Sequence, residues 1–119
     1  MDLQEAAALD FCYLTTTGRR TGHPHTIEIW FGVNENQDRL FLLAGGGDQS
    51  DWVRNLIANP TVALRLGDHD MITKAHVVAD PEEDAAVRQL LLEKYTRPSG
   101  DDLSEWAASA LPIAVELHP

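Results

Sequence analysis

A run of three glycines, residues 45–47, separates an apolar stretch from an amphipathic one near the middle of the chain. Residues 40–44 are apolar on both faces and predict a central strand. The residues after the glycines predict a helix that stops at Asn59-Pro60 and has Trp52, Val53, Leu56 and Ile57 on its apolar face. A glycine turn before a helix leaves backbone N–H groups free, and the helix start carries a partial positive charge. The turn can therefore hold a phosphate or another anion. The alternative is that Asp48 or Ser50 caps the helix and that nothing binds.

Hydrophobic patterning predicts an α+β, mainly antiparallel fold that forms a single domain over residues 1–119. Short polar turns between the strands indicate hairpins, and a sheet with few helices buries both faces most easily by curling into a small barrel. The predicted strands are residues 11–17, 25–33, 40–44, 61–66, 71–79 and 112–117. Peripheral helices are predicted at residues 2–9, after the glycines, from an N-cap at Asp80, and at residues 101–110.

The strand predicted at residues 25–33 alternates cleanly between two faces. The face with Ile27 and Ile29 belongs to the core. The opposite face places Glu28 and Trp30 next to each other, which suits the wall of a pocket or a subunit interface. The alternative is a solvated face that carries one exposed tryptophan.

The net charge of −10 argues against binding to nucleic acid or to an anionic membrane surface. No apolar run approaches the length of an integral membrane segment, and the first residues lack the features of a signal peptide. The single cysteine, Cys12, rules out an internal disulfide and is predicted to be an inert, buried thiol. Together these features predict a cytoplasmic protein.

Several common catalytic and binding motifs are missing from the sequence. The five histidines lack the spacing of a metal site, so no metal is predicted and the histidines are expected in solvated loops. There is no nucleophile elbow, P-loop or dinucleotide-binding fingerprint. What remains is the glycine turn, a loop with the adjacent pair Arg19-Arg20, and aromatic walls. This combination favours a phosphorylated aromatic cofactor, whose phosphate takes backbone N–H groups and an arginine.

Two segments resemble the signatures of the deazaflavin-dependent nitroreductase family. Residues 13–25, YLTTTGRRTGHPH, resemble the family motif T-T-G-R-x-S-G-x-P-R. Residues 43–60 resemble the second signature, with matches at Gly46, Gly47, Trp52 and Asn55 and then in LIANP. The chain departs from the family at two cations: His25 replaces an arginine, and Ala44-Gly45 stands where many members carry a lysine.

The resemblance implies a split β-barrel related to flavin-binding pyridoxamine phosphate oxidases. It also implies an oxidoreductase that uses 8-hydroxy-5-deazaflavin (F420 type) or FMN to pass a hydride to a quinone, a nitro compound or an enone. A homodimer with the cofactor at its interface is expected, and no side chain is assigned as a catalytic acid or base. The alternative is a non-catalytic module of the same fold that holds a flavin, haem or a fatty acid.

The resemblance places the arginines near the cofactor's phosphate, the glycine turn around that phosphate, and the Glu28–Trp30 face against the ring or the substrate. The cofactor-binding residues expected in this way are Arg19, Arg20, His25, Thr26, Glu28, Trp30, Ala44, Gly45, Gly46, Gly47, Trp52 and Asn55.

Overall fold

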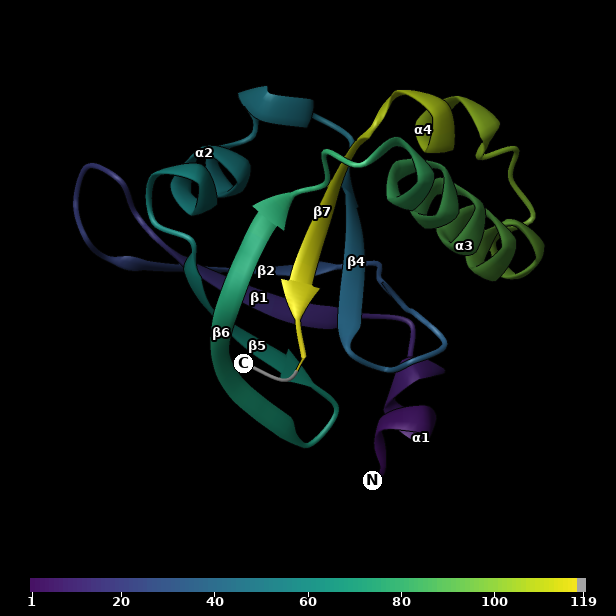
Figure 1. Cartoon of the computed structure of the whole chain (residues 1–119), viewed down its shortest axis with the longest axis horizontal. Helices are drawn as coiled ribbons and strands as arrows, with labels where there is room; N and C mark the ends of the chain where they lie inside the picture. Colours follow the sequence, from purple (N-terminus) through teal and green to yellow (C-terminus); the bar gives the residue numbers. More distant parts are fainter. Residues whose placement is uncertain (118–119) are drawn as a thin grey trace.

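A computed structural model describes residues 1–117, with only the backbone described at residues 97–99. Its strands form one antiparallel sheet in the order β2-β1-β5-β6-β7-β4-β3, and the sheet curls around a core (Figure 1). The strands are β1 (Cys12–Thr17), β2 (Pro24–Ile29), β3 (Gly32–Val33), β4 (Arg39–Ala44), β5 (Thr61–Leu66), β6 (His69–Val77) and β7 (Leu111–Glu116). The helices are α1 (Leu3–Ala7), the 3₁₀ turn η1 (Gly47–Gln49), α2 (Asp51–Ala58), α3 (Pro81–Ser99) and α4 (Ser104–Ser109). The predicted fold class is confirmed.

The long strand β6 joins the two halves of the sheet. Residues 69–74 pair with β5, whereas residues 75–77 pair with β7. Because one strand serves both partners, the sheet turns a corner along β6, and β2 and β3 are left as its edge strands. Figure 1 shows α2 on one side of the curled sheet and α3 with α4 on the other, with β4 and β7 between them.

Two groups of buried side chains hold the layers together. The first fills the inside of the curl and includes Leu14, Leu42, Val53, Leu64 and Ile113, so α2 closes one end of the sheet. The second lies between α3 and the outer side of β4 and β7, where Phe41, Val87, Leu91, Tyr95 and Ala114 meet. Each fully buried aliphatic side chain contributes about 1.5–3 kcal/mol of transfer free energy.

The structure divides the single strand predicted at residues 25–33 into β2 and β3, so the sheet has seven strands rather than six. The reason is Tyr95 of α3. Its hydroxyl receives a hydrogen bond from the Phe31 backbone N–H at 2.9 Å and lies 2.9 Å from the Phe31 carbonyl oxygen. A side chain from a distant helix thus takes the backbone groups that a continuous ladder would use.

Local signals set both ends of α3, and its start is as predicted. The Asp80 side chain accepts a hydrogen bond from the Glu83 backbone N–H at 3.0 Å, and Pro81 begins the helix. The helix ends at Gly100, which adopts a left-handed conformation with φ of 71°. The prediction for α2 was wrong in one respect: Ile57, placed on the apolar face with Trp52, Val53 and Leu56, is 58% exposed.

Cys12 is fully buried, as predicted. None of the helices described at residues 1–117 combines the length and the apolar character that a bilayer crossing requires.

Candidate functional site

The loop between β1 and β2, residues 18–23, is closed by its own backbone. Gly18 N–H donates to the His23 carbonyl, and Gly22 N–H donates to the Gly18 carbonyl, each at 2.8 Å. Gly22 has φ of +75°, which favours glycine at that position. The loop therefore presents Arg19 and Arg20 from a defined turn.

Asn55 of α2 fixes this loop to the helix. Its Oδ1 atom accepts from the Arg19 backbone N–H at 3.1 Å and from the Arg19 guanidinium at 2.9 Å, and its Nδ2 lies 3.3 Å from Thr16 Oγ1. The guanidinium also pairs with Asp51 at 3.2 Å. Asn55 is only 4% exposed. The two segments predicted to form one site therefore meet, but Arg19 and Asn55 use their polar groups on each other.

A cleft of about 650 Å³, here called the arginine cleft, opens beside this junction. It brings together half of the residues expected at the site: Arg19, Arg20, His25, Thr26, Trp52 and Asn55. The other residues of its wall are Gly18, Thr21, Pro24, Ile27 and Asp51.

Arg20 is the cation of this cleft that is free to bind an anion. Its side chain is exposed and makes no hydrogen bond or ion pair with any residue that the structure describes. At the start of α2, Ser50 occupies the N-cap position but makes no side-chain capping hydrogen bond. The first-turn N–H groups of α2 are therefore not capped by a side chain, and the neighbouring charge of Asp51 is paired with Arg19.

None of the three glycines of the turn lines the arginine cleft. Gly47 has φ of +59°, which favours glycine where the chain turns into α2, whereas a Cβ on Gly46 would meet only Ser50 Oγ, the end of a side chain that can rotate away. A Cβ on Gly45 would lie 3.8 Å from Trp106. Ala44 is buried in the core. The side chain of Ala44 therefore faces the protein interior, and the three glycines can offer only backbone groups.

A second hollow of about 400 Å³, here called the tryptophan cleft, is lined by Phe11, Glu28, Ile29, Trp30, Leu43, Leu103 and Trp106. Trp30 stacks on Tyr95 with ring centroids 4.2 Å apart and planes 1° from parallel. Trp106 meets Trp30 edge to face at 5.6 Å and 86°. Glu28 accepts a hydrogen bond from the Tyr13 hydroxyl at 2.7 Å, and this bond raises the pKa of Tyr13 above its ordinary value. The Glu28–Trp30 face is thus a pocket wall.

Arg88 of α3 holds the short helix that carries Trp106. Its guanidinium donates to three carbonyls at the end of α4, those of Ala107, Ala108 and Ala110, at 2.9, 3.0 and 2.8 Å. It also pairs with Asp84 one helical turn earlier. These bonds satisfy carbonyl groups that a helix end leaves without partners, and they fix the position of Trp106.

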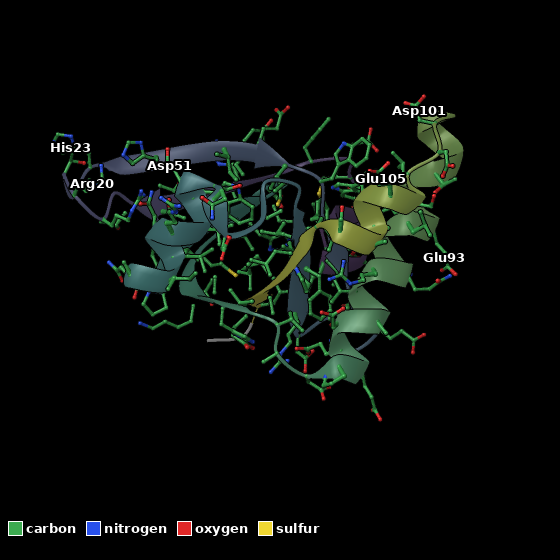
Figure 2. All side chains as sticks on the ribbon, turned by 90° about the horizontal axis from the view of Figure 1, so that it is seen from above. Arg20, His23, Asp51, Glu93, Asp101 and Glu105 are labelled. Atoms are coloured by element: carbon green, nitrogen blue, oxygen red, sulfur yellow. The ribbon has the colours of Figure 1, made fainter. Side chains whose placement is uncertain are left out.

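The two clefts lie end to end along the same two segments. Residues 24–27 of β2 line the arginine cleft, and residues 28–30 continue into the tryptophan cleft. In the same way Leu43 borders the tryptophan cleft, and the chain then passes through the glycine turn to Asp51 and Trp52 in the arginine cleft. Figure 2 shows Arg20, His23 and Asp51 at one end of this arrangement and Glu105 of α4 at the other.

The model of a protein family described as F420H(2)-dependent quinone reductase matches residues 4–118. The chain belongs to this family. It is therefore an oxidoreductase, and the predicted kinship with deazaflavin-dependent reductases is confirmed.

Solved structures support the same placement for this member of the quinone reductase family. An F420-H2 dependent reductase, FDR-A, is 25% identical with a TM-score of 0.69, over 90% of this chain and 94% of that one. A structure described as a domain-swapped dimer is also 25% identical, with a TM-score of 0.70 over 90% and 80% of the two chains. The haem storage protein HutZ from Vibrio cholerae has a TM-score of 0.73 at 15% identity over 96% and 86%. Such neighbours identify the curled sheet as a split β-barrel of the pyridoxamine-phosphate-oxidase type.

Sequence reasoning missed the residues that turn the Glu28–Trp30 face of this quinone reductase family member into a cleft. Tyr95, Leu103 and Trp106 come from α3 and α4, far along the chain. One signal was present: Trp106 is the only large side chain in a helix otherwise made of small and polar residues. Among residues 1–117, no group of three histidine, cysteine or carboxylate side chains is placed to hold a metal ion.

Proposed function

We propose that this family member uses a reduced F420-type deazaflavin to transfer a hydride to a small organic acceptor, namely a quinone, a nitro compound or an enone. The observation that carries the proposal is the arginine cleft, where a free guanidinium and an uncapped helix start meet beside an aromatic cleft. Anion-binding groups in one cleft and aromatic surfaces in the next suit a phosphate-bearing coenzyme together with a planar acceptor.

The donor set of the arginine cleft fits one phosphate group. Arg20 has its guanidinium available, and the first turn of α2, whose Asp51 and Trp52 line the same cleft, has N–H groups that no side chain caps. His25 adds a ring nitrogen, and Trp52 adds an apolar surface. Arg19 and Asn55 bond to each other, and these bonds hold the β1–β2 loop against α2.

The other expected residues take supporting places. Thr26 shares a 2.7 Å hydrogen bond with Thr15, so it shapes the wall of the cleft. The backbone of Gly45, Gly46 and Gly47 passes between the clefts, and Ala44 anchors that turn in the core. Glu28 and Trp30 lie where the ring or the acceptor would sit.

When bound, the reduced deazaflavin supplies a hydride, and a quinone acceptor that also takes one proton from solvent leaves as the hydroquinone. The side chains named here bind and orient the reactants and exclude water. This division of work needs no side chain as a proton donor, in agreement with the absence of an assigned acid or base.

A titration of the purified protein with an F420-type deazaflavin and, separately, with FMN tests the proposal. We expect saturable binding of the deazaflavin and weaker binding of FMN, followed by cofactor fluorescence. Mixing the protein with reduced deazaflavin and menadione should then restore the absorbance of the oxidised cofactor. Binding of neither cofactor would refute the proposal, and preferential binding of FMN would reassign the cofactor. Binding without turnover on any acceptor would favour the non-catalytic module.

The homodimer and the cytoplasmic location stay predictions. The domain-swapped dimer among the structural neighbours supports a dimer. The exposed side chains of Tyr13 on β1 and Ile72 on β6 lie on the same face of the sheet, on the two strands that flank β5, and are also in keeping with a partner surface. Sedimentation equilibrium would measure the mass of the particle in solution.

A further inference from the structure

The tryptophan cleft combines apolar walls with a single charge. Among the described residues that line it, six are apolar and Glu28 alone is ionisable. Its volume of about 400 Å³ lies within the range of small-molecule pockets, about 300–1,000 Å³. Two indole rings at right angles give it flat surfaces on which an aromatic ring can pack.

Among the residues whose side chains the structure describes, no cation pairs with the Glu28 carboxylate. One carboxylate oxygen accepts the Tyr13 hydroxyl, which is uncharged. Two cations of this half of the molecule have other partners: Arg65 pairs with Asp70 at 3.1 Å, and the Lys94 ammonium donates to three backbone carbonyls. Glu28 can therefore act on whatever enters the cleft.

The surroundings of the cleft are acidic as well. Figure 2 shows Glu93 on α3 and Glu105 on α4, at the opposite end of the molecule from Arg20 and His23. The whole chain carries a net charge of −10. The summed field of such side chains attracts cations and repels anions near this end.

From these features we infer that the tryptophan cleft is the acceptor site, that it prefers planar aromatic acceptors carrying a positive charge, and that Glu28 determines this preference. The inference extends the proposed function, since it names the acceptor class. Indole faces bind cations through the ring quadrupole, and the carboxylate adds direct attraction. An acceptor of the same shape with a negative charge meets repulsion from Glu28 and gains nothing from the indoles.

Three 1,4-naphthoquinones that share one ring system test the inference: neutral menadione, an analogue with a trimethylammonium group, and an analogue with a sulfonate group. Binding is followed by quenching of tryptophan fluorescence in the Trp52→Phe protein. Of the three tryptophans, only Trp30 and Trp106 then report, and both line the tryptophan cleft. We expect the cationic quinone to bind about two- to five-fold more tightly than menadione, and the sulfonate more weakly by a similar factor. The differences should shrink at high salt.

Three substitutions test whether the difference in quinone affinity arises in the tryptophan cleft. Glu28→Gln should make the cationic quinone and menadione bind equally. Glu35→Gln, in the exposed β3–β4 turn, changes the net charge by the same amount. It should not change the ratio between the affinities for the cationic quinone and for menadione. Trp106→Leu should weaken all three quinones. The inference would be overturned if the Trp52→Phe protein bound the three quinones equally, or if it bound the sulfonate most tightly. It would also be overturned if Glu28→Gln left the affinity ratio of the cationic quinone to menadione unchanged.

These titrations contain no deazaflavin, so their outcome is independent of the cofactor titration that tests the proposed function. Deazaflavin binding together with no charge preference among the quinones would overturn this inference alone. If the quinones showed the charge preference but no deazaflavin bound, the tryptophan cleft would still be a site for cationic aromatic molecules. The proposed hydride transfer from a deazaflavin would then be refuted.

Discussion

Arg19 and Asn55 are joined through a single oxygen atom. Asn55 Oδ1 accepts both the backbone N–H of Arg19, at 3.1 Å, and its guanidinium, at 2.9 Å, although the two residues are 36 positions apart. Because Asn55 is buried, these bonds are shielded from water, and a neutral amide holds the arginine loop against α2.

We expect Asn55→Ala to lower the free energy of unfolding by about 1–3 kcal/mol, because it leaves the Arg19 N–H without its partner. Urea denaturation measures the change. The matched control is Asn36→Ala in the exposed β3–β4 turn, which should change stability by less than about 0.5 kcal/mol. Equal stabilities for the two variants would show that the loop does not depend on Asn55.

The two adjacent arginines should behave differently. Arg20→Ala should weaken deazaflavin binding by about 1–3 kcal/mol without affecting unfolding, because a charge-assisted bond to phosphate is lost and no internal contact is. Arg19→Ala should reduce stability as well as binding, because it breaks the contacts to Asn55 and Asp51. Arg65→Ala removes an exposed arginine whose partner is Asp70 and serves as the control for charge. An unchanged dissociation constant for Arg20→Ala would remove Arg20 from the cofactor site.

Tyr95→Phe should destabilise the fold by about 1–3 kcal/mol, since it leaves the buried Phe31 N–H unpaired while the ring stacked on Trp30 remains. Tyr13→Phe is the control, because the Tyr13 hydroxyl lies on the surface and bonds only to Glu28. Thermal unfolding followed by circular dichroism compares the two variants. A Tyr95→Phe protein as stable as Tyr13→Phe would disprove the role of the hydroxyl at the strand break.

Cys12 should resist thiol reagents in the folded protein. Burial raises the pKa of the Cys12 thiol from 9.0 to about 12. The fraction present as the reactive thiolate at pH 8 therefore falls by about 1,000-fold relative to an exposed cysteine, in addition to the steric protection. A disulfide reagent that releases a coloured thiolate, added in buffer and in concentrated urea, measures the two rates. Comparable rates would mean that β1 opens readily.

Lys94 should make stability rise with pH above about 8. Burial lowers the pKa of Lys94 from 10.5 to about 8, so between these values the unfolded chain holds a proton that the folded chain has released. Where the unfolded state binds more protons, the free energy of unfolding increases with pH. Partial exposure screens the charge, so we expect the wild type to gain about 1 kcal/mol between pH 7.5 and pH 9.5 relative to Lys94→Met. Urea denaturation of both proteins at the two pH values measures this gain. If the free energies of unfolding of wild type and Lys94→Met differed by the same amount at both pH values, the lowered pKa of Lys94 would be contradicted.

The sequence alone predicted those features that depend on neighbouring residues. Alternating hydrophobicity located the strands, and the Asp80-Pro81 start located α3. The break between β2 and β3 was not predictable, since its cause, Tyr95, lies 64 positions beyond Phe31. Periodicity placed Ile57 inward, but whether a helix face is covered depends on the packing of the whole chain.

The candidate site was predictable to the same extent. The motifs led to the arginine loop and to α2, whose contact the structure shows. They did not reveal that Asn55 binds Arg19 rather than facing the cleft with free polar groups, because residue identity alone does not tell which partner an amide takes. The tryptophan cleft needed α4, whose position depends on Arg88.

Strand β2 lines both clefts, but the helix that completes the wall differs. It is α2 in the arginine cleft and α4 in the tryptophan cleft. Substitutions in the six residues of α4 can consequently alter which molecules are accepted while the anchorage of the coenzyme stays intact. A lineage built on this scaffold can diversify its chemistry one end at a time.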